Sequence, residues 1–160
     1  MTTAPTPRPW LALTGFIAAA FAAGAIGSWA TFPAVRTWFP ALVKPAWNPP
    51  GWLFGPVWTT LYVLMGVAVW RVWRTRAPAA PALVKIYFVQ LAFNALWSVL
   101  FFGLQQPAWA LADIVLLWSL LVWLQAGFGR ADRLAAALWL PYVLWVGFAA
   151  ALNLAIVRLN

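Results

Sequence analysis

The chain has 160 residues, of which 66% are hydrophobic and only 8% are charged, whereas charged residues make up about a quarter of a typical soluble domain. It carries ten Lys and Arg against two Asp and Glu, with 14 Trp, no His and no Cys. Without imidazole or thiol it lacks the usual ligands of zinc and haem iron and the usual Ser/Cys–His nucleophiles. The composition predicts a membrane protein with neither a metal site nor catalytic residues, and the scattered basic residues argue against nucleic-acid binding.

Five apolar stretches are each long enough to cross a bilayer as a helix, which takes about 20 residues. They predict an all-α membrane protein in which one domain, residues 1–160, forms a bundle of five transmembrane helices. Prolines at or just before the helix starts support the boundaries, because a missing N–H does no harm there. The predicted spans are 10–30, 52–73, 83–103, 108–127 and 134–157.

The first span has the length of a membrane helix and exceeds the apolar region of a cleaved signal peptide. Small residues recur along it at helical spacing, which lets another helix approach closely. That partner is either a helix of the same bundle or a second subunit. The two rows are Gly15, Ala19, Ala23 and Gly27, and Ala20, Gly24 and Ser28.

The distribution of basic residues predicts the orientation, because cytoplasmic loops retain Lys and Arg. Seven of the ten fall on the side of the N-terminus, which predicts a cytoplasmic N-terminus in a bacterial cell membrane. Tryptophans near the span ends are typical of anchors in the membrane interface. The basic residues are Arg8, Arg71, Arg74, Arg76, Lys85, Arg130 and Arg133, and the predicted anchors are Trp10, Trp29, Trp70, Trp73, Trp123 and Trp139.

The connection between the first two spans, residues 31–51, is the only one long enough to cover an end of the bundle. Polar and aromatic side chains gather at the same end of the other spans, where we expect a cavity. Residues three or four apart share a helix face, so these side chains form two stripes. The stripes are Gln90, Asn94, Trp97 and Phe101, and Trp145, Ala149, Leu152 and Asn153.

The amides in these stripes have two interpretations. Inside a bilayer they need partners, so they face the interior of the bundle and can hydrogen-bond helices together. Alternatively, amides beside aromatic rings are the mixture expected of a pocket for a small, flat, apolar ligand.

Asp113 is the only acidic residue inside a predicted span. An intramembrane carboxylate is a candidate for proton coupling or for contact with a polar part of a ligand. It also lies within about two turns of the start of its helix, where the helix dipole and water stabilise an anion. Both interpretations remain open from the sequence.

Residues 44–52, KPAWNPPGW, and 55–62, GPVWTTLY, resemble the signature of the TspO/MBR family. This family comprises the tryptophan-rich sensory proteins related to the mitochondrial translocator protein, the peripheral-type benzodiazepine receptor. The resemblance extends over about residues 30–158. Further similar blocks are 90–98, 101–103, 109–113 and 141–153.

The resemblance implies a five-helix membrane receptor, commonly a homodimer, that binds tetrapyrroles such as protoporphyrin IX and benzodiazepine-site ligands beneath the first loop. No cofactor is implied. Sterol transport is not carried over, because 152–158 lacks the Tyr of the animal sterol pattern. The family's ligand-pocket positions correspond here to Trp52, Asn94, Trp97, Trp145, Ala149 and Leu152, and their place at the same end of the bundle adds Ser28, Trp47, Phe101 and Asp113.

Three functions are compatible with this pattern. The first is a tetrapyrrole sensor or regulator, in which indoles stack on the porphyrin while Lys44 or Arg36 meets its propionates. The second is a transporter of porphyrins or other amphiphiles, which would need Asp113 and alternating access. The third is light- or oxygen-dependent porphyrin breakdown, in which Trp rings act as redox partners.

Overall fold

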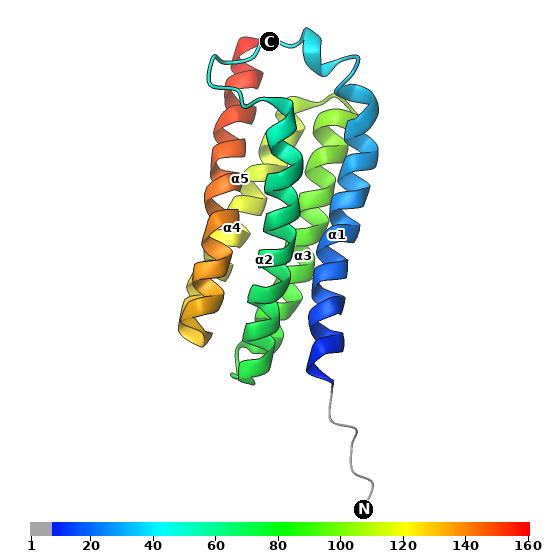
Figure 1. The fold of residues 1–160 in the computed structure, drawn as a ribbon. Helices are drawn as coiled ribbons and strands as arrows, with labels where there is room; N and C mark the ends of the chain where they lie inside the picture. The colour runs from blue at the N-terminus through cyan, green and yellow to red at the C-terminus, as the bar shows by residue number, and fades with distance from the viewer. Residues whose placement is uncertain (1–7) are drawn as a thin grey trace, which may run out of the picture.

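The computed structural model of the protein describes residues 8–160. Within this part of the chain, five long helices run side by side in one bundle, each antiparallel to the next, and the first loop crosses one end (Figure 1). The predicted five-helix, all-α fold is confirmed. The helices are α1 (Pro9–Ala34), α2 (Phe54–Thr75), α3 (Ala80–Ser98), α4 (Pro107–Ala131) and α5 (Arg133–Leu159), with short helical turns η1 (Phe39–Ala41), η2 (Gly51–Leu53) and η3 (Val99–Gly103).

Two helix ends differ from the predicted spans. Helix α1 continues through Pro33 to Ala34, because a proline in the last turn removes only one intrahelical hydrogen bond. The end of the third span, η3, is a π-helical turn rather than an α-helix, and the N–H of Leu104 donates to the carbonyl of Val99 at 2.7 Å. Such turns are rare and often lie at functional sites. This one places Phe101, which is buried, beneath the first loop.

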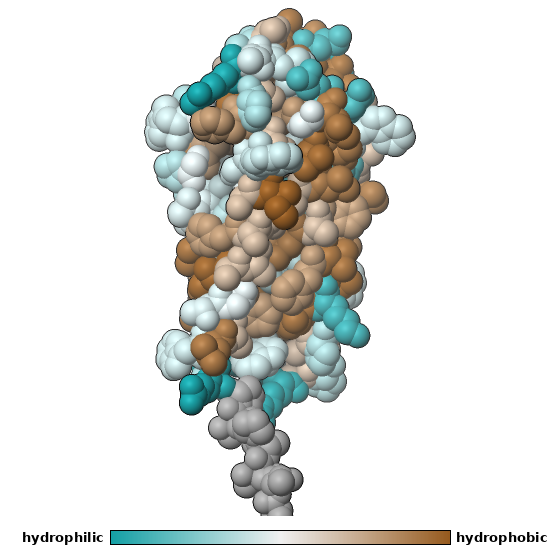
Figure 2. Space-filling model, turned by 90° about the vertical axis from the view of Figure 1, so that its right-hand side faces the viewer, coloured by the Kyte–Doolittle hydropathy of each residue, from teal (hydrophilic) through white to brown (hydrophobic). Residues whose placement is uncertain are grey.

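The outer surface of the bundle identifies its solvent. All five helices are long and apolar enough to cross a membrane, and large apolar side chains lie exposed along them, such as Leu11, Val115 and Leu144. On the face that Figure 2 shows, apolar side chains cover the middle and hydrophilic ones gather toward the two ends. A water-soluble monomer rarely exposes so much continuous apolar surface. The chain is therefore an integral membrane protein.

Only some of the small residues of α1 serve packing inside the bundle. Gly24 lies against the ring of Tyr62 in α2, and a Cβ added at Gly27 would lie 2.9 Å from Oγ of Ser98. Gly15, by contrast, has no neighbour within 4 Å, and Ser28 is exposed. The two rows of small residues are thus divided between the bundle interior and the lipid-facing surface.

Two predicted interface anchors are core residues instead. Trp139 is fully buried, and its indole N–H donates to the carbonyl of Leu121 at 3.2 Å. Trp70 is buried and donates to the carbonyl of Pro9 at 2.8 Å. Closeness to a span end does not reveal which face of the helix a ring occupies, and both rings lie on inward faces. Trp10, Trp29 and Trp123 are exposed, as expected of anchors.

Asp132 joins the end of α2 to the connection between α4 and α5. Its carboxylate caps α5 by accepting the N–H of Ala135 at 2.9 Å, and it accepts Nη2 of Arg71 at 2.8 Å. Burial raises the pKa of Asp132, but the Ala135 N–H and the Arg71 guanidinium outweigh this effect and hold the pKa below its ordinary value.

This lowered pKa makes the bundle sensitive to acid. The Asp132 carboxylate stabilises the fold above its ordinary pKa of 3.8, and this contribution is lost as the pH falls through the lower pKa of the folded state. We expect the thermal midpoint in detergent to fall more for the parent than for Asp132→Asn between about pH 6 and about pH 3. Asparagine can still cap α5, so the comparison isolates the charge, and equal pH dependence would contradict this account.

Close packing between α1 and α2 gives a second prediction. A Cβ at Gly66 would meet the backbone of Ile17, 2.9 Å from both its N and Cα, and also its side chain. Because backbone cannot rotate away, Gly66→Ala should force the helices apart and cost roughly 1–3 kcal/mol, measured as a lower unfolding temperature. Gly15→Ala, which meets nothing within 4 Å, is the control and should be neutral or stabilising. Equal changes in the unfolding temperature of the two variants would mean that helix propensity, and not the close approach of α1 and α2, determines the effect.

Candidate functional site

The first loop, residues 35–50, is braced by its own hydrogen bonds. The ammonium of Lys44 donates to the carbonyls of Phe39 at 2.8 Å, Leu42 at 2.7 Å and Pro40 at 3.3 Å. An ammonium has three N–H donors, so this set occupies all of them. Lys44 therefore shapes the loop and is not a free cation for a ligand acid.

The loop is also fastened to the end of α5. The N–H of Val43 donates to Oδ1 of Asn160 at 2.9 Å, and Nδ2 of Asn160 donates back to the carbonyl of Val43 at 3.0 Å. Further along the loop, the ring of Trp47 contacts Phe148 edge to face, with centroids 5.7 Å apart. The loop is thus a cover attached to α5.

Beneath the cover lies a group of apolar side chains that we call the loop-end cluster. Trp97 stacks on Phe101, with centroids 5.2 Å apart, and Trp38 of the loop packs edge-on against Phe101 at 5.7 Å. The cluster brings together three predicted site residues, Trp97, Phe101 and Leu152. Its buried centre is Phe101, Ala110, Leu152 and Ile156, surrounded by Trp38, Phe39, Leu42, Trp97, Leu100, Phe102 and Phe148.

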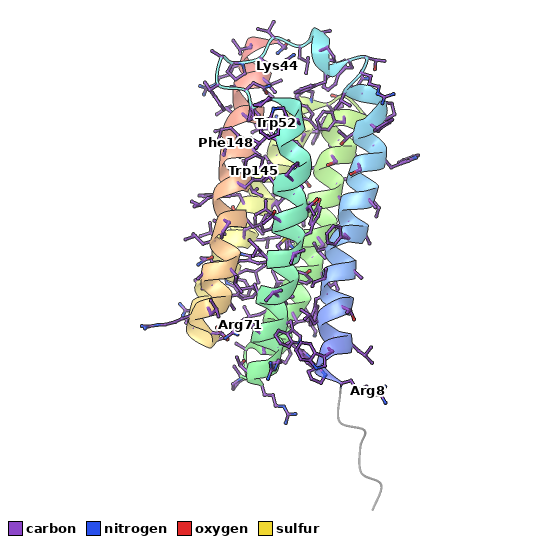
Figure 3. The ribbon with its side chains drawn as sticks, viewed as in Figure 1. Arg8, Lys44, Trp52, Arg71, Trp145 and Phe148 are labelled. Atoms are coloured by element: carbon purple, nitrogen blue, oxygen red, sulfur yellow. The ribbon has the colours of Figure 1, made fainter. Side chains whose placement is uncertain are left out.

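A second group of rings, the α2–α5 seam, adjoins this cluster. Trp145 lies 5.9 Å from Phe54 of α2 and 5.6 Å from Phe148, between ring centroids. Figure 3 shows Trp145 and Phe148 on neighbouring turns of α5, at the end covered by the loop that carries Lys44. The indole nitrogen of Trp145 is buried and has no hydrogen-bond partner among the described residues. The seam therefore offers stacking faces and one unpaired donor.

The buried amides act first as connections between helices. Nδ2 of Asn94 donates to the hydroxyl of Tyr142 at 2.9 Å, and that hydroxyl donates to Oε1 of Gln90 at 2.8 Å. Asn153 accepts the indole N–H of Trp97 at 3.0 Å. Hydrogen bonding between helices thus accounts for both asparagines. Asn94 positions Tyr142, and Asn153 positions Trp97.

Asp113 lies inside the bundle on α4, on the same face as Ala110 and Leu117. The residue is only 5% exposed, and neither carboxylate oxygen has a partner among the described residues. Its burial argues against solvation by bulk water near the helix start. A buried polar group without a partner requires an explanation, such as an internal water, a proton or a ligand.

Comparison with known proteins agrees with this architecture. The model of the TspO/MBR family matches residues 16–159. The chain belongs to the TspO/MBR family. It is 41% identical over 152 residues to Tryptophan-rich protein TspO of Chlorobaculum tepidum, covering 94% of this chain and 96% of that protein. It is 35% identical over 157 residues to Translocator protein of Homo sapiens (95% and 92% covered) and 39% identical over 123 residues to Tryptophan-rich sensory protein of Cereibacter sphaeroides (77% of each).

Not every predicted site residue of this TspO/MBR protein joins these two groups of rings. Trp52 is 74% exposed, because the η2 turn places it at the rim of the bundle. Ser28 is exposed on α1, and Ala149 is half-buried against the main core. Trp47 and Trp145 lie in the seam, and Trp97, Phe101 and Leu152 lie in the loop-end cluster.

Aromatic rings of the loop-end cluster and the seam occupy much of the space beneath the loop, where the sequence predicts a cavity. Two hollows among the described residues lie elsewhere. One, of about 330 Å³, lies on the outer face of α5 near Leu154 and Arg158, and the other lies at the opposite end of the bundle beside Arg71. A flat ligand can enter the seam of this TspO/MBR protein only by separating rings that now touch one another.

Three residues of the site were missed from the sequence. Phe148 belongs to both ring groups, and its position three residues after Trp145 places it on the same helix face, which was a usable signal. Phe54 contacts Trp145 from the first turn of α2. Trp38 lies in the loop, where no periodicity indicates which side chains turn inward.

Removing the Tyr142 hydroxyl tests the amide network. Tyr142→Phe leaves the amides of Asn94 and Gln90 without their shared partner, and an unsatisfied buried group costs about 1–3 kcal/mol. We expect a clear drop in thermal midpoint in detergent. Tyr62→Phe is the matched control, because no hydrogen bond of the Tyr62 hydroxyl is found among the described residues, and it should change the midpoint little. Equal drops in thermal midpoint for the two variants would show that the amide network adds nothing to the stability of the bundle.

Proposed function

We propose that this TspO/MBR protein is a membrane receptor or sensor that binds tetrapyrroles such as protoporphyrin IX, and benzodiazepine-site ligands, in the α2–α5 seam. The observation that carries the proposal is Trp145, an indole among aromatic rings with a buried, unpaired N–H. A flat ring offers the seam stacking faces, and a carboxylate or ring nitrogen offers the indole an acceptor. The names of relatives, which include a sensory protein and a translocator protein, support the same class.

The rest of the proposal concerns the setting of the receptor. We place it in a bacterial cell membrane with a cytoplasmic N-terminus, as a homodimer surrounded by lipid. It requires no cofactor and performs no catalysis. The cation for a propionate is Arg36, which is exposed and stacks over the ring of Phe32 at 4.3 Å, whereas Lys44 is occupied within the loop.

Fluorescence titration of the purified protein with protoporphyrin IX tests this proposal. The parent should show saturable quenching of Trp fluorescence. Trp145→Phe keeps a ring but removes the N–H, so its affinity should fall several-fold, as expected for the loss of about 1 kcal/mol. Asn94→Ala should also weaken binding, because it releases Tyr142, whose ring packs edge-on between α5 and Trp58 of α2 close to the seam.

The control is Trp123→Phe, which alters an indole on the lipid-facing side of α4 that is 53% exposed. It should leave the affinity unchanged. Quenching that does not saturate, or affinities that are the same in all four proteins, would mean that the porphyrin partitions onto apolar surface and would overturn the proposal.

One observation favours transport as a second candidate function. Asp113 is buried with both carboxylate oxygens unpaired, as expected of a group that exchanges a proton during movement of a substrate. Saturable porphyrin flux into vesicles that depends on a proton gradient and is lost in Asp113→Asn would support this function. Saturable porphyrin binding without such flux would exclude transport and leave the sensor as the proposed function.

A further inference from the structure

The end of the bundle opposite the loop is strongly basic. Its polar residues form what we call the arginine-rich end, and Figure 3 shows Arg8 and Arg71 there, far from Lys44 and Trp52. Of the two acidic residues in the chain, only Asp132 lies at this end. The basic residues of the arginine-rich end are Arg8, Arg71, Arg74, Arg76, Lys85, Arg130 and Arg133.

A hollow of about 290 Å³ opens at this end, between the last turn of α2 and the connection from α4 to α5. It is lined by Arg71, Arg74, Thr75 and Asp132. Since one water takes about 30 Å³ of liquid volume, the hollow has room for a tetrahedral anion with part of its hydration shell.

Two of the residues that line this hollow carry guanidinium groups that are held in place but not fully hydrogen-bonded. Arg71 is fixed through Nη2 by Asp132, while its Nε is buried and has no acceptor among the described residues. Arg74 stacks over the ring of Trp70, with its guanidinium carbon 4.7 Å from the centroid. Trp70 is itself held by the carbonyl of Pro9. Two guanidinium groups are thus oriented before any anion arrives.

The other two lining groups are already occupied. The Thr75 hydroxyl donates to the carbonyl of Val72 at 2.7 Å and accepts the N–H of Ala77 at 3.2 Å. The Asp132 carboxylate is engaged by Arg71 and by the N–H of Ala135. With Asp132 balanced by Arg71, the lining keeps the positive charge of Arg74, so the hollow favours an anion and not a cation.

We propose that this hollow binds the phosphate of an anionic phospholipid headgroup, with Arg71 and Arg74 as donors. Guanidinium groups form strong, charge-assisted hydrogen bonds to phosphate, and basic pockets between the ends of membrane helices bind anionic headgroups. The position favours a lipid over free phosphate. Leu134 at the start of α5 is 51% exposed, and Ala137 and Pro141, at i+3 and i+7 on the same helix face, are exposed as well. An apolar surface for acyl chains therefore begins two residues after Asp132 and continues along α5 into the bilayer.

Native mass spectrometry of the full chain, titrated with phosphatidylglycerol, tests this site. The parent should retain one tightly bound lipid, and Arg74→Gln should weaken its binding about tenfold, as expected for the loss of a charge-assisted contact. Arg130→Gln is the matched control, because it removes the same charge from the same end but does not line the hollow. A loss of binding that is equal in the two variants would mean attraction by the general field of the arginine-rich end and would overturn the proposal.

A second variant and two other probes complete the test. Arg71→Lys keeps the charge but removes Nε, and it should weaken binding while the circular dichroism spectrum stays that of the folded parent. Phosphatidylcholine, whose headgroup is neutral overall, should bind much more weakly than phosphatidylglycerol. Inorganic phosphate should displace the lipid only at high concentration, and displacement at a concentration equal to that of the lipid would assign the site to free phosphate and overturn the lipid proposal.

Discussion

The hydrogen bonds that Tyr142 makes to Asn94 and Gln90 hold α3 to α5 in a medium that offers no competing partner. In a bilayer each buried polar group must find its partner within the protein, so these amides restrict how the two helices can pack. Asn153 does the same by fixing the indole of Trp97. The position of the rings in the loop-end cluster therefore depends on amides that do not themselves need to touch a ligand.

Aromatic packing then determines the state of the site. In the seam, Trp145 contacts Phe54 edge to face and Phe148 by a tilted face, with centroids 5.9 and 5.6 Å apart. Each such pair is worth about 0.5–1.5 kcal/mol beyond burial. A ligand that separates these rings must replace those contacts. A broad, flat and rigid molecule does so most effectively, because it offers two faces at once and loses little conformational entropy on binding.

The sequence was sufficient for the five spans, because length and hydrophobicity decide membrane crossing. It did not separate Trp139, a core residue, from an interface anchor, since the facing of a ring is set by neighbouring helices. It also placed Trp52 with the other site residues, whereas the η2 turn leaves that ring exposed at the rim of the bundle. The π turn at η3 was not predicted either, since the sequence pattern of the third span continues through it unchanged.

The two ends of the contact between α2 and α5 differ in kind. At the arginine-rich end, Arg71 of α2 is joined to Asp132, the N-cap of α5, by an ion pair at 2.8 Å. Toward the loop, the described side chains of α2 and α5 meet through rings, with no hydrogen bond between the two helices. Apolar contacts impose no particular direction on the two helices, whereas an ion pair with a helix cap fixes the position of α2 relative to the start of α5. The contact between α2 and α5 is thus fixed in direction at the arginine-rich end and purely apolar at the loop end, where the loop itself is fastened to α5 through Asn160.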